Sequence, residues 1–368
     1  GSVTKQFSAV CILQLEEKGL LSVNDSLQKY IPDYPQGDLI TIRHLLTHTS
    51  GIPNFTDFPD YTAIMIIPSP LEKTIERFKN LPLEFQLGEK YSYSNSNYIL
   101  LGYIIEKVSG QSFEKYLHEN ILDRLQMVNS GYDHSEKILA KRASGYELSS
   151  GGLVNTPYMD MSVPHAAGAM YSTVEDMYLW DQALYTEKVL SKASLDRMFT
   201  PFLGNYGYGW VISTAYNRKL ISHSGGINGF LTHISRFVED QVTIIVLSNF
   251  SFAKSDSIAL NLSAIVFGEP YEMPKERTFI EVDPAVLDIY VGQYEIQPGL
   301  TADITRKEHL LFIQVQGQPA VGLLPESETQ FYIREADATL TFMKNEPGNI
   351  PGAMLHQSGK DVPLKKIK

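Results

Sequence analysis

The sequence predicts a mixed α/β (α+β) domain followed by a small all-β barrel. Three observations lead to this fold class. Helical periodicity dominates up to about residue 200, and β-like runs follow one another from there to about residue 250. From about residue 287 the chain holds short β-like runs separated by turn residues. We therefore expect one domain over residues 1–267, a linker over 268–284 and a barrel over 285–368.

Helices are expected at four places in the first 200 residues. Apolar residues recur at helical spacing from Val3 to Cys11 in the first helix. "DLITIRHLLTHTSGI" suggests a short helix with Thr41 as N-cap, and "SNYILLGYIIEKVSG" an apolar helix ended by Gly110. "STVEDMYLWDQAL" starts like a capping box, with Ser172 as the cap and Glu175 as its partner.

Strands are expected after residue 200. The runs "YGYGWVIS", "KLISHSGG", "GFLTHISRFV" and "VTIIVLSNF" are separated by short turn segments that suit antiparallel hairpins. A helix from about Ser255 to Phe267 follows, and the proline-rich "GEPYEMPKERTFIEVDP" reads as a linker. The last part contains "YVGQYEI", "TADITRK", "LLFIQV", "TQFYIR" and "ATLTFMK", the pattern of a small barrel or sandwich.

Composition excludes several classes of protein. The net charge of −11 and pI near 5.3 make a nucleic acid an unfavourable partner, because its phosphates are also negative. The single cysteine, Cys11, cannot form an internal disulfide. No apolar run reaches the 18 residues that would suggest a membrane-spanning helix.

The chain opens on a serine and a lysine three residues apart, Ser2 and Lys5. A serine hydroxyl needs a nearby base to act as a nucleophile, and residues i and i+3 of a helix share one face. The spacing alone is weak evidence, because S-x-x-K occurs four times, at Ser2/Lys5, Ser26/Lys29, Ser112/Lys115 and Ser251/Lys254.

Two further motifs supply candidate partners. Tyr93 and Asn95 form the only Y-x-N, in a polar turn before an apolar helix, where a phenolate could act as base and the amide could hold Lys5. His223 and Gly225 belong to the only H-S-G, at the end of a predicted strand. Simpler interpretations stay open: Tyr93 as core packing, Asn95 as an N-cap and "GGIN" as a turn.

These motifs, in this order, resemble the serine β-lactamase and penicillin-binding-protein superfamily. The resemblance is closest to the branch related to class C β-lactamases, which includes esterases and D-amino-acid peptidases. It covers roughly residues 1–267 and includes "GSVTKQF", "ITIRHLLTHTSGI", "YSNSNYILLGYIIEKVSG", "AAGAMYSTVEDMYLW" and "HSGGINGF". The last part of the chain resembles the lipocalin-like barrel appended to some members.

The resemblance implies a role for each motif residue. Ser2 would be the acylated nucleophile and Lys5 would assist its deprotonation. Tyr93 would carry a proton to and from the leaving group. Asn95 would bind Lys5 and the substrate amide or acyl chain. The fold implied is an antiparallel sheet flanked by helices, with a helical lobe beside it.

The strand motif carries the remaining roles that the resemblance implies. The backbone N–H groups of Ser2 and Gly226 would form the oxyanion hole, and Gly225 would keep the strand edge clear for substrate. His223 stands where many relatives carry lysine. Because a neutral histidine lacks the permanent cation of lysine, we expect esters and peptides ahead of β-lactams as substrates.

One departure concerns the start of the chain. Family members carry several tens of residues before the S-x-x-K helix, which form a first helix and the first strands of the sheet. These residues are not in this sequence, so we expect a missing piece rather than a natural start at Gly1.

The sequence therefore predicts a serine hydrolase that acts through an acyl-enzyme on esters, D-amino-acid peptides or β-lactams, without a cofactor or metal. His44 and His48 have helical spacing, but "HLLTH" lacks the glutamate of H-E-x-x-H. The alternative is a catalytically silent penicillin-binding-like sensor or envelope binding protein. A bacterial cell envelope or secreted setting is implied by the resemblance alone, and the oligomeric state is left open.

Overall fold

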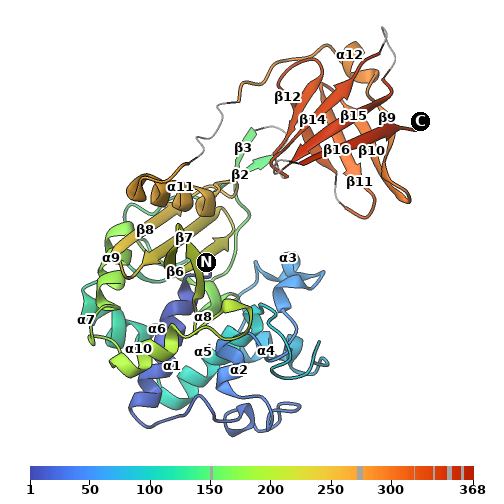
Figure 1. Ribbon diagram of the computed structural model, residues 1–368. Helices are drawn as coiled ribbons and strands as arrows, with labels where there is room; N and C mark the ends of the chain where they lie inside the picture. The colour runs from blue at the N-terminus through green and yellow to red at the C-terminus, as the bar shows by residue number, and fades with distance from the viewer. Residues whose placement is uncertain (150–151, 272–276, 319, 335, 346–349, 358–359) are drawn as a thin grey trace. The chain divides into compact units, whose positions relative to one another are not determined.

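The computed structural model describes residues 1–149, 152–271, 277–318, 320–334, 336–345, 350–357 and 360–368 (Figure 1). The chain divides into two compact units, Gly1–Glu272 and Met273–Lys368. The first contains helices and sheets and the second is a closed barrel, as the fold-class prediction stated.

Two buried helices form the centre of the first unit. Every residue of α1 (Thr4–Glu17) from Thr4 to Leu15 is buried, and α5 (Asn95–Ser109) is buried along most of its length. The two helices pack against each other, and each also contacts α8 (His165–Gly168). Helices that are buried on all sides need no polar face toward solvent, which explains the weak amphipathic pattern of both.

The unit has further helices outside this pair. They are α2 (Ile42–Leu46), α3 (Tyr61–Ile64), α4 (Leu71–Lys79), α6 (Phe113–Leu117), α7 (Asp123–Leu125), α9 (Val174–Ala183), α10 (Lys192–Met198) and α11 (Ser255–Phe267). Short helical turns lie at η1 (Leu27–Lys29), η2 (Phe55–Asp57), η3 (His118–Leu122) and η4 (Leu203–Asn205). Thr41 caps α2 and Gly110 ends α5 in the left-handed conformation, as predicted.

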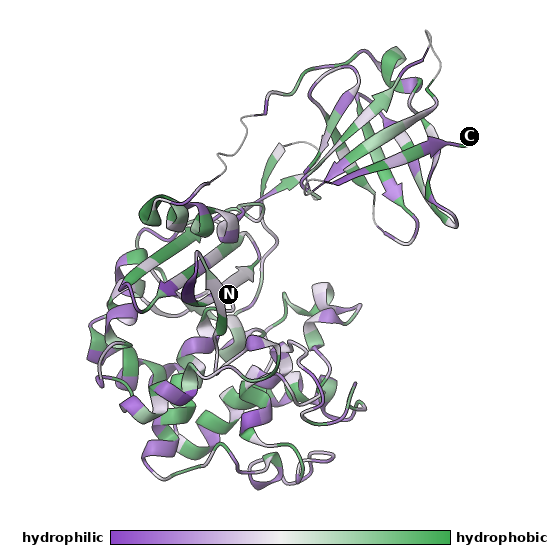
Figure 2. Ribbon diagram, in the orientation of Figure 1, coloured by the Kyte–Doolittle hydropathy of each residue, from purple (hydrophilic) through white to green (hydrophobic). Residues whose placement is uncertain are grey.

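The main sheet is antiparallel, with strand order β5 (Val211–Ala215), β6 (Arg218–Ile227), β7 (Phe230–Phe237), β8 (Val242–Ser248). This confirms the predicted succession of hairpins. The pairing of β5 with β6 ends at Val211 and Ser222, so the last five residues of β6 pair only with β7. Helix α11 packs on β7 and β8, and Figure 2 shows apolar colouring on both α11 and β8.

The N-cap of α9 differs from the prediction by one residue. Thr173, rather than Ser172, accepts the backbone N–H of Asp176 at 3.2 Å. Ser172 is held instead by a hydrogen bond of 2.8 Å to Ser130. Smaller elements that the sequence did not reveal are the ribbon β2 (Tyr146–Ser149) with β3 (Gly152–Asn155), and the short pair β1 (Gly131–Tyr132) with β4 (Met170–Tyr171).

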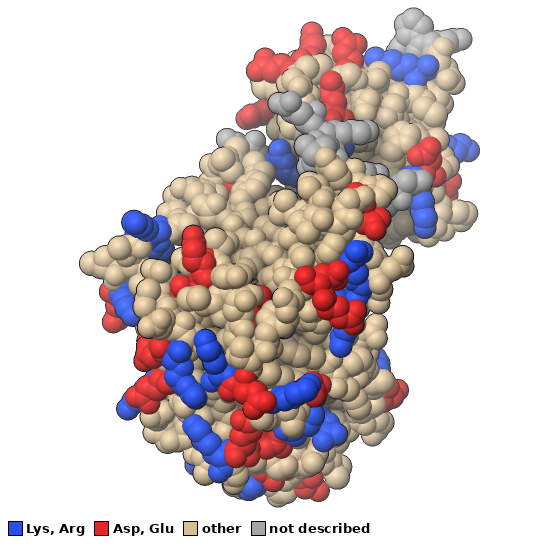
Figure 3. Space-filling model, turned by 60° about the vertical axis from the view of Figure 1, so that its left-hand side comes forward, with Lys and Arg blue, Asp and Glu red and all other residues tan. Residues whose placement is uncertain are grey.

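Charged side chains of both signs cover the helices of the first unit. On the face in Figure 3, Lys and Arg lie among Asp and Glu there, without a broad field of one sign. Some of these charged side chains form exposed ion pairs, such as Lys192 with Asp196. Such pairs contribute little to stability, so the stability of the first unit comes mainly from its buried interior.

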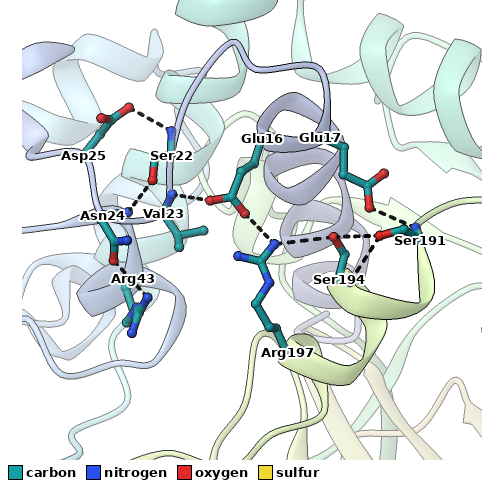
Figure 4. A network of polar contacts seen from close by, with 10 residues as sticks. All are labelled: Glu16, Glu17, Ser22, Val23, Asn24, Asp25, Arg43, Ser191, Ser194 and Arg197. Atoms are coloured by element: carbon teal, nitrogen blue, oxygen red, sulfur yellow. Dashed lines mark hydrogen bonds and ion pairs between the residues drawn. The ribbon is translucent and has the colours of Figure 1, made fainter.

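Carboxylates at the end of α1 fasten this helix to its surroundings (Figure 4). Glu16 accepts the backbone N–H of Val23 at 2.9 Å and a guanidinium N–H of Arg197 at 2.7 Å. Glu17 accepts the backbone N–H of Ser191 at 2.8 Å. The C-terminal end of α1 is therefore tied both to the following loop and to the start of α10, which restricts motion of the helix that begins beside Ser2.

The second unit is a closed barrel of eight antiparallel strands, preceded by α12 (Pro284–Asp288). The strands are β9 (Gly292–Gln297), β10 (Leu300–Lys307), β11 (Leu310–Val315), β12 (Val321–Pro325), β13 (Gln330–Ile333), β14 (Ala338–Met343), β15 (Gly352–Gln357) and β16 (Lys360–Lys366). The predicted lipocalin-like barrel is thereby confirmed. Within the described residues, no helix has the length and apolar character needed to cross a bilayer.

Candidate active site

Ser2 lies two residues before α1, and Lys5 is the second residue of the helix. The Lys5 backbone N–H donates to the Ser2 carbonyl at 3.0 Å, so Ser2 is already part of the first helical turn. The two side chains consequently share a face, with 3.0 Å between Lys5 Nζ and Ser2 Oγ. This is the pair that the opening motif predicted to meet.

Two carbonyl oxygens also contact the Lys5 amine. Nζ lies 2.8 Å from Asn95 Oδ1 and 2.9 Å from the backbone oxygen of Ala167. The rings of Tyr93 and Tyr98 lie 4.9 and 5.5 Å from Nζ. The side chain is fully buried, and this burial lowers the pKa of Lys5 well below its usual value.

Asn95 is the first residue of α5, so the alternative of Asn95 as an N-cap is wrong: Ser94 holds that position. The Asn95 backbone N–H donates to Asn54 Oδ1 at 2.9 Å, and its side-chain Nδ2 donates to Thr56 Oγ1 at 3.1 Å. Asn95 therefore faces Lys5 with its oxygen and the η2 turn with its nitrogen.

Tyr93 lies just before α5, with its ring 4.3 Å from that of His48 and 6.2 Å from that of His223. Its hydroxyl oxygen is buried and forms no hydrogen bond of standard geometry with the described residues. Burial raises the pKa of Tyr93 above its usual range, while the nearby Ser2 hydroxyl lowers it in part. The phenol is therefore protonated at neutral pH, so Tyr93 does not rest as a phenolate base.

His223 is neutral and has protein partners at both ring nitrogens. Nδ1 lies 2.5 Å from the backbone oxygen of Ser224 and must carry the hydrogen, because a carbonyl can only accept. Nε2 therefore accepts the hydroxyl hydrogen of Tyr206 at 2.8 Å. Burial is the largest cause that lowers the pKa of His223, to about 3.

The end of β6 lies against the start of α1. A β-carbon on Gly225 would stand 2.5 Å from Thr232 Oγ1, 3.0 Å from the Ser2 nitrogen and 3.2 Å from the Val3 nitrogen, so glycine suits this close approach. Ile227 and Phe230 close a two-residue hairpin turn, and antiparallel pairs alternate in their hydrogen bonding. The N–H of Gly226 accordingly points away from β7, toward the edge that β5 leaves open.

His48 also lies at the site, although the sequence motifs did not include it. Its Nδ1 accepts the Ser94 backbone N–H at 3.2 Å and lies 3.2 Å from Asn97 Nδ2, so its hydrogen is on Nε2. His44, the other half of the candidate metal pair, instead accepts the Thr41 backbone N–H through its Nδ1 at 3.2 Å. His44 and His48 therefore contact different parts of the chain. The positive φ of His48 (55°), at the end of "HLLTH", is typical of a turn.

Comparison with known proteins gives consistent matches. A family model described as Beta-lactamase matches residues 1–265, and one described as a Domain of unknown function (DUF3471) matches residues 276–366. Penicillin-binding protein 4* of Bacillus subtilis is 31% identical over 397 residues, which cover 100% of this chain and 87% of that protein. The putative penicillin-binding protein PbpX of the same organism is 36% identical over 251 residues, 68% of this chain and 61% of its own length.

A solved structure is similar over both units. The octameric penicillin-binding protein homologue from Pyrococcus abyssi has 28% identity and a TM-score of 0.67, covering 99% of this chain and 87% of that one.

Proposed function

Because the chain belongs to the beta-lactamase family and is a serine hydrolase, we propose that Ser2 is its nucleophile and forms an acyl-enzyme intermediate. The observation that carries this proposal is the environment of Lys5. A neutral amine has two N–H donors and one lone pair. The oxygens of Asn95 and Ala167 take both donors, which leaves the lone pair for the Ser2 hydroxyl 3.0 Å away.

In this arrangement Ser2 donates its hydrogen to Lys5. When Ser2 Oγ attacks the substrate carbonyl carbon, the proton moves to Nζ and the carbonyl electron pair moves to its oxygen. The resulting ammonium keeps its contacts, since its third donor now faces Ser2 Oγ. Burial, which lowers the pKa of Lys5, keeps the amine free to accept that proton.

Tyr93 is suited to deliver the proton to the leaving group. Its phenol is protonated at neutral pH and its hydroxyl has no partner of standard geometry among the described residues. As the bond to the leaving group breaks, Tyr93 donates its proton and regains one from the Lys5 ammonium. Water then attacks the acyl-enzyme by the reverse proton path, releasing the acid and regenerating Ser2.

The negative charge that develops on the substrate carbonyl oxygen needs hydrogen-bond donors beside it. The N–H of Gly226 points to the open edge of β6, and Ser2 N lies within reach of the same strand through Gly225. We assign the oxyanion hole to the backbone N–H groups of Ser2 and Gly226. Such preorganised donors stabilise the tetrahedral intermediate in acyl transfer.

The properties of His223 affect which class of substrate the site favours. Because it is neutral and both of its nitrogens are engaged within the protein, it offers no cation to a substrate carboxylate. This supports esters first, then D-amino-acid peptides, then β-lactams. The names of the relatives do not decide between these classes.

The test is hydrolysis of a p-nitrophenyl ester by the wild-type protein and by Ser2→Ala. We expect a burst of p-nitrophenol from the wild type and none from the variant, with weaker reaction toward a penicillin. Full activity in Ser2→Ala would contradict the assignment. No reaction of the wild type with ester, D-amino-acid amide or penicillin would favour the alternative of a silent binding protein.

A further inference from the structure

The start of α5 is joined to a loop from elsewhere in the chain, residues 48–56. Every position from Ser94 to Asn97 contacts this loop. The contacts are Ser94 N–H to His48 Nδ1 (3.2 Å), Asn95 N–H to Asn54 Oδ1 (2.9 Å), Asn95 Nδ2 to Thr56 Oγ1 (3.1 Å), Ser96 Oγ to the Pro53 oxygen (2.6 Å) and Ser50 Oγ to Asn97 Oδ1 (2.6 Å). The loop therefore satisfies backbone donors that a capping side chain would otherwise satisfy.

The contact to the side chain of Asn95 has a chemical consequence. An amide has nearly the same shape in its two flipped orientations, so packing alone cannot select one. Lys5 has to meet the oxygen, because only an oxygen accepts its N–H. The nitrogen then needs an acceptor on the opposite side, and Thr56 Oγ1 supplies it.

We propose that Thr56 is a positioning residue for acylation: its hydroxyl fixes the Asn95 amide so that the Lys5 lone pair points at Ser2. The proposal rests on the proposed function. If the amide turned over, Nδ2 would donate to the Lys5 lone pair and compete with the Ser2 hydroxyl. Thr56 would thus govern the base without touching either Lys5 or the reacting atoms.

Two substitutions separate the hydroxyl from the shape of the side chain. Thr56→Val keeps the branched shape but removes the acceptor, whereas Thr56→Ser keeps the acceptor. Thr62→Val, on the exposed side of α3, is a matched control for the same chemical change outside the loop. Tyr93, Tyr98, His48 and His223 also face Lys5 and are unaltered in all three variants.

The first measurement is kcat/KM for the p-nitrophenyl ester as a function of pH. We expect Thr56→Val to lower the plateau roughly tenfold, the effect of one lost hydrogen bond. We also expect its acid limb to move to lower pH, because the Lys5 ammonium loses an acceptor. Thr56→Ser and Thr62→Val stay within about twofold of wild type, a difference below the effect of one hydrogen bond.

The second measurement does not require turnover. Lysine labelled with ¹³C at Cε reports the titration of Lys5 by NMR, and Thr56→Val should lower its midpoint while the other two variants leave it in place. Unchanged kcat/KM and an unchanged midpoint in Thr56→Val would overturn the proposal, as would an equal loss in Thr56→Ser. If the wild type fails to acylate but the midpoint still moves, the proposed function fails while the positioning by Thr56 stands.

Discussion

The interiors of the two units differ in chemistry. The first unit buries Lys5, His48, Asn97, Asp181 and Arg236, whereas Thr339 is the only buried polar side chain among the described residues of the barrel. An apolar interior is the simpler route to stability, because buried polar groups must be fully paired. We infer that Lys5, His48 and Asn97 are retained for the proposed site around Ser2, whereas the Asp181–Arg236 pair serves the fold.

Replacement of the buried base should have the largest effect. Lys5→Met fills a similar volume but cannot accept the Ser2 proton, so kcat/KM for an ester should fall by roughly 10²–10⁴. The free energy of unfolding should change little, because the cost of desolvating the amine disappears while Asn95 Oδ1 and the Ala167 oxygen lose a donor. Ester kinetics and urea denaturation measure both. A less stable but active variant would show that Lys5 serves the fold rather than the reaction.

A buried ion pair between Asp181 and Arg236 sharpens the comparison, because it is polar but remote from Ser2. Arg236 Nε lies 2.5 Å from Asp181 Oδ1, and both side chains are almost fully buried. Asp181→Ala should destabilise the first unit by about 3–5 kcal/mol, since Arg236 is left without its counter-charge. The control is Asp240→Ala, which breaks the partly exposed contact with Arg218 and should cause a loss of at most about 1 kcal/mol. Equal losses in urea denaturation would refute the distinction.

Two glycine-to-alanine substitutions, one in each unit, can be compared directly. Gly225→Ala would bring a β-carbon to 2.5 Å from Thr232 Oγ1 and 3.0 Å from the Ser2 nitrogen, so we expect kcat/KM to fall roughly a hundredfold as the strand and the nucleophile shift apart. Gly322→Ala in β12 meets no atom within 4 Å and should leave activity unchanged. Normal kinetics in Gly225→Ala would mean that the strand can move away from α1 without consequence.

A gradual effect is expected on the pH dependence of stability. The pKa of His223 falls to about 3 in the folded protein, from an ordinary value near 6.5. Between these values the unfolded chain binds one more proton, so stability is lost as the pH falls from about 6.5 to about 3. Relative to His223→Gln, the wild type should lose about 1.4 kcal/mol more per pH unit in this window. Parallel urea midpoints against pH would show that His223 titrates normally.

The sequence predicted much of this architecture because its signals were local. Ser2 and Lys5 are one helical turn apart, and the hairpin order of β5 to β8 follows from short turns between β-like runs. The cap of α9 was misassigned because Ser172 and Thr173 are adjacent hydroxyl residues, each followed three positions later by an acidic residue. Local pattern could not choose between them, whereas the Ser130 contact does.

The residues and strands that the sequence did not predict were missed for a different reason. Ala167 contributes a backbone carbonyl, which has no side-chain signature, and Thr56 meets Asn95 only because a remote loop lies beside α5. Strands β15 and β16 were not assigned individually, since "GAMLHQ" and "KDVPLKK" mix apolar residues with charge and proline. Tertiary contact, rather than periodicity, decides these positions.

The central claim is that Ser2 becomes acylated because a buried, neutral Lys5 takes its proton. The most direct test is the intact mass of the wild type, Ser2→Ala and Lys5→Met after acid quenching of a reaction with an activated ester, with peptide mapping of any adduct. The account predicts one acyl group on Ser2 in the wild type, none in Ser2→Ala and far slower labelling in Lys5→Met. An adduct on another residue, or equal labelling in Lys5→Met, would contradict it.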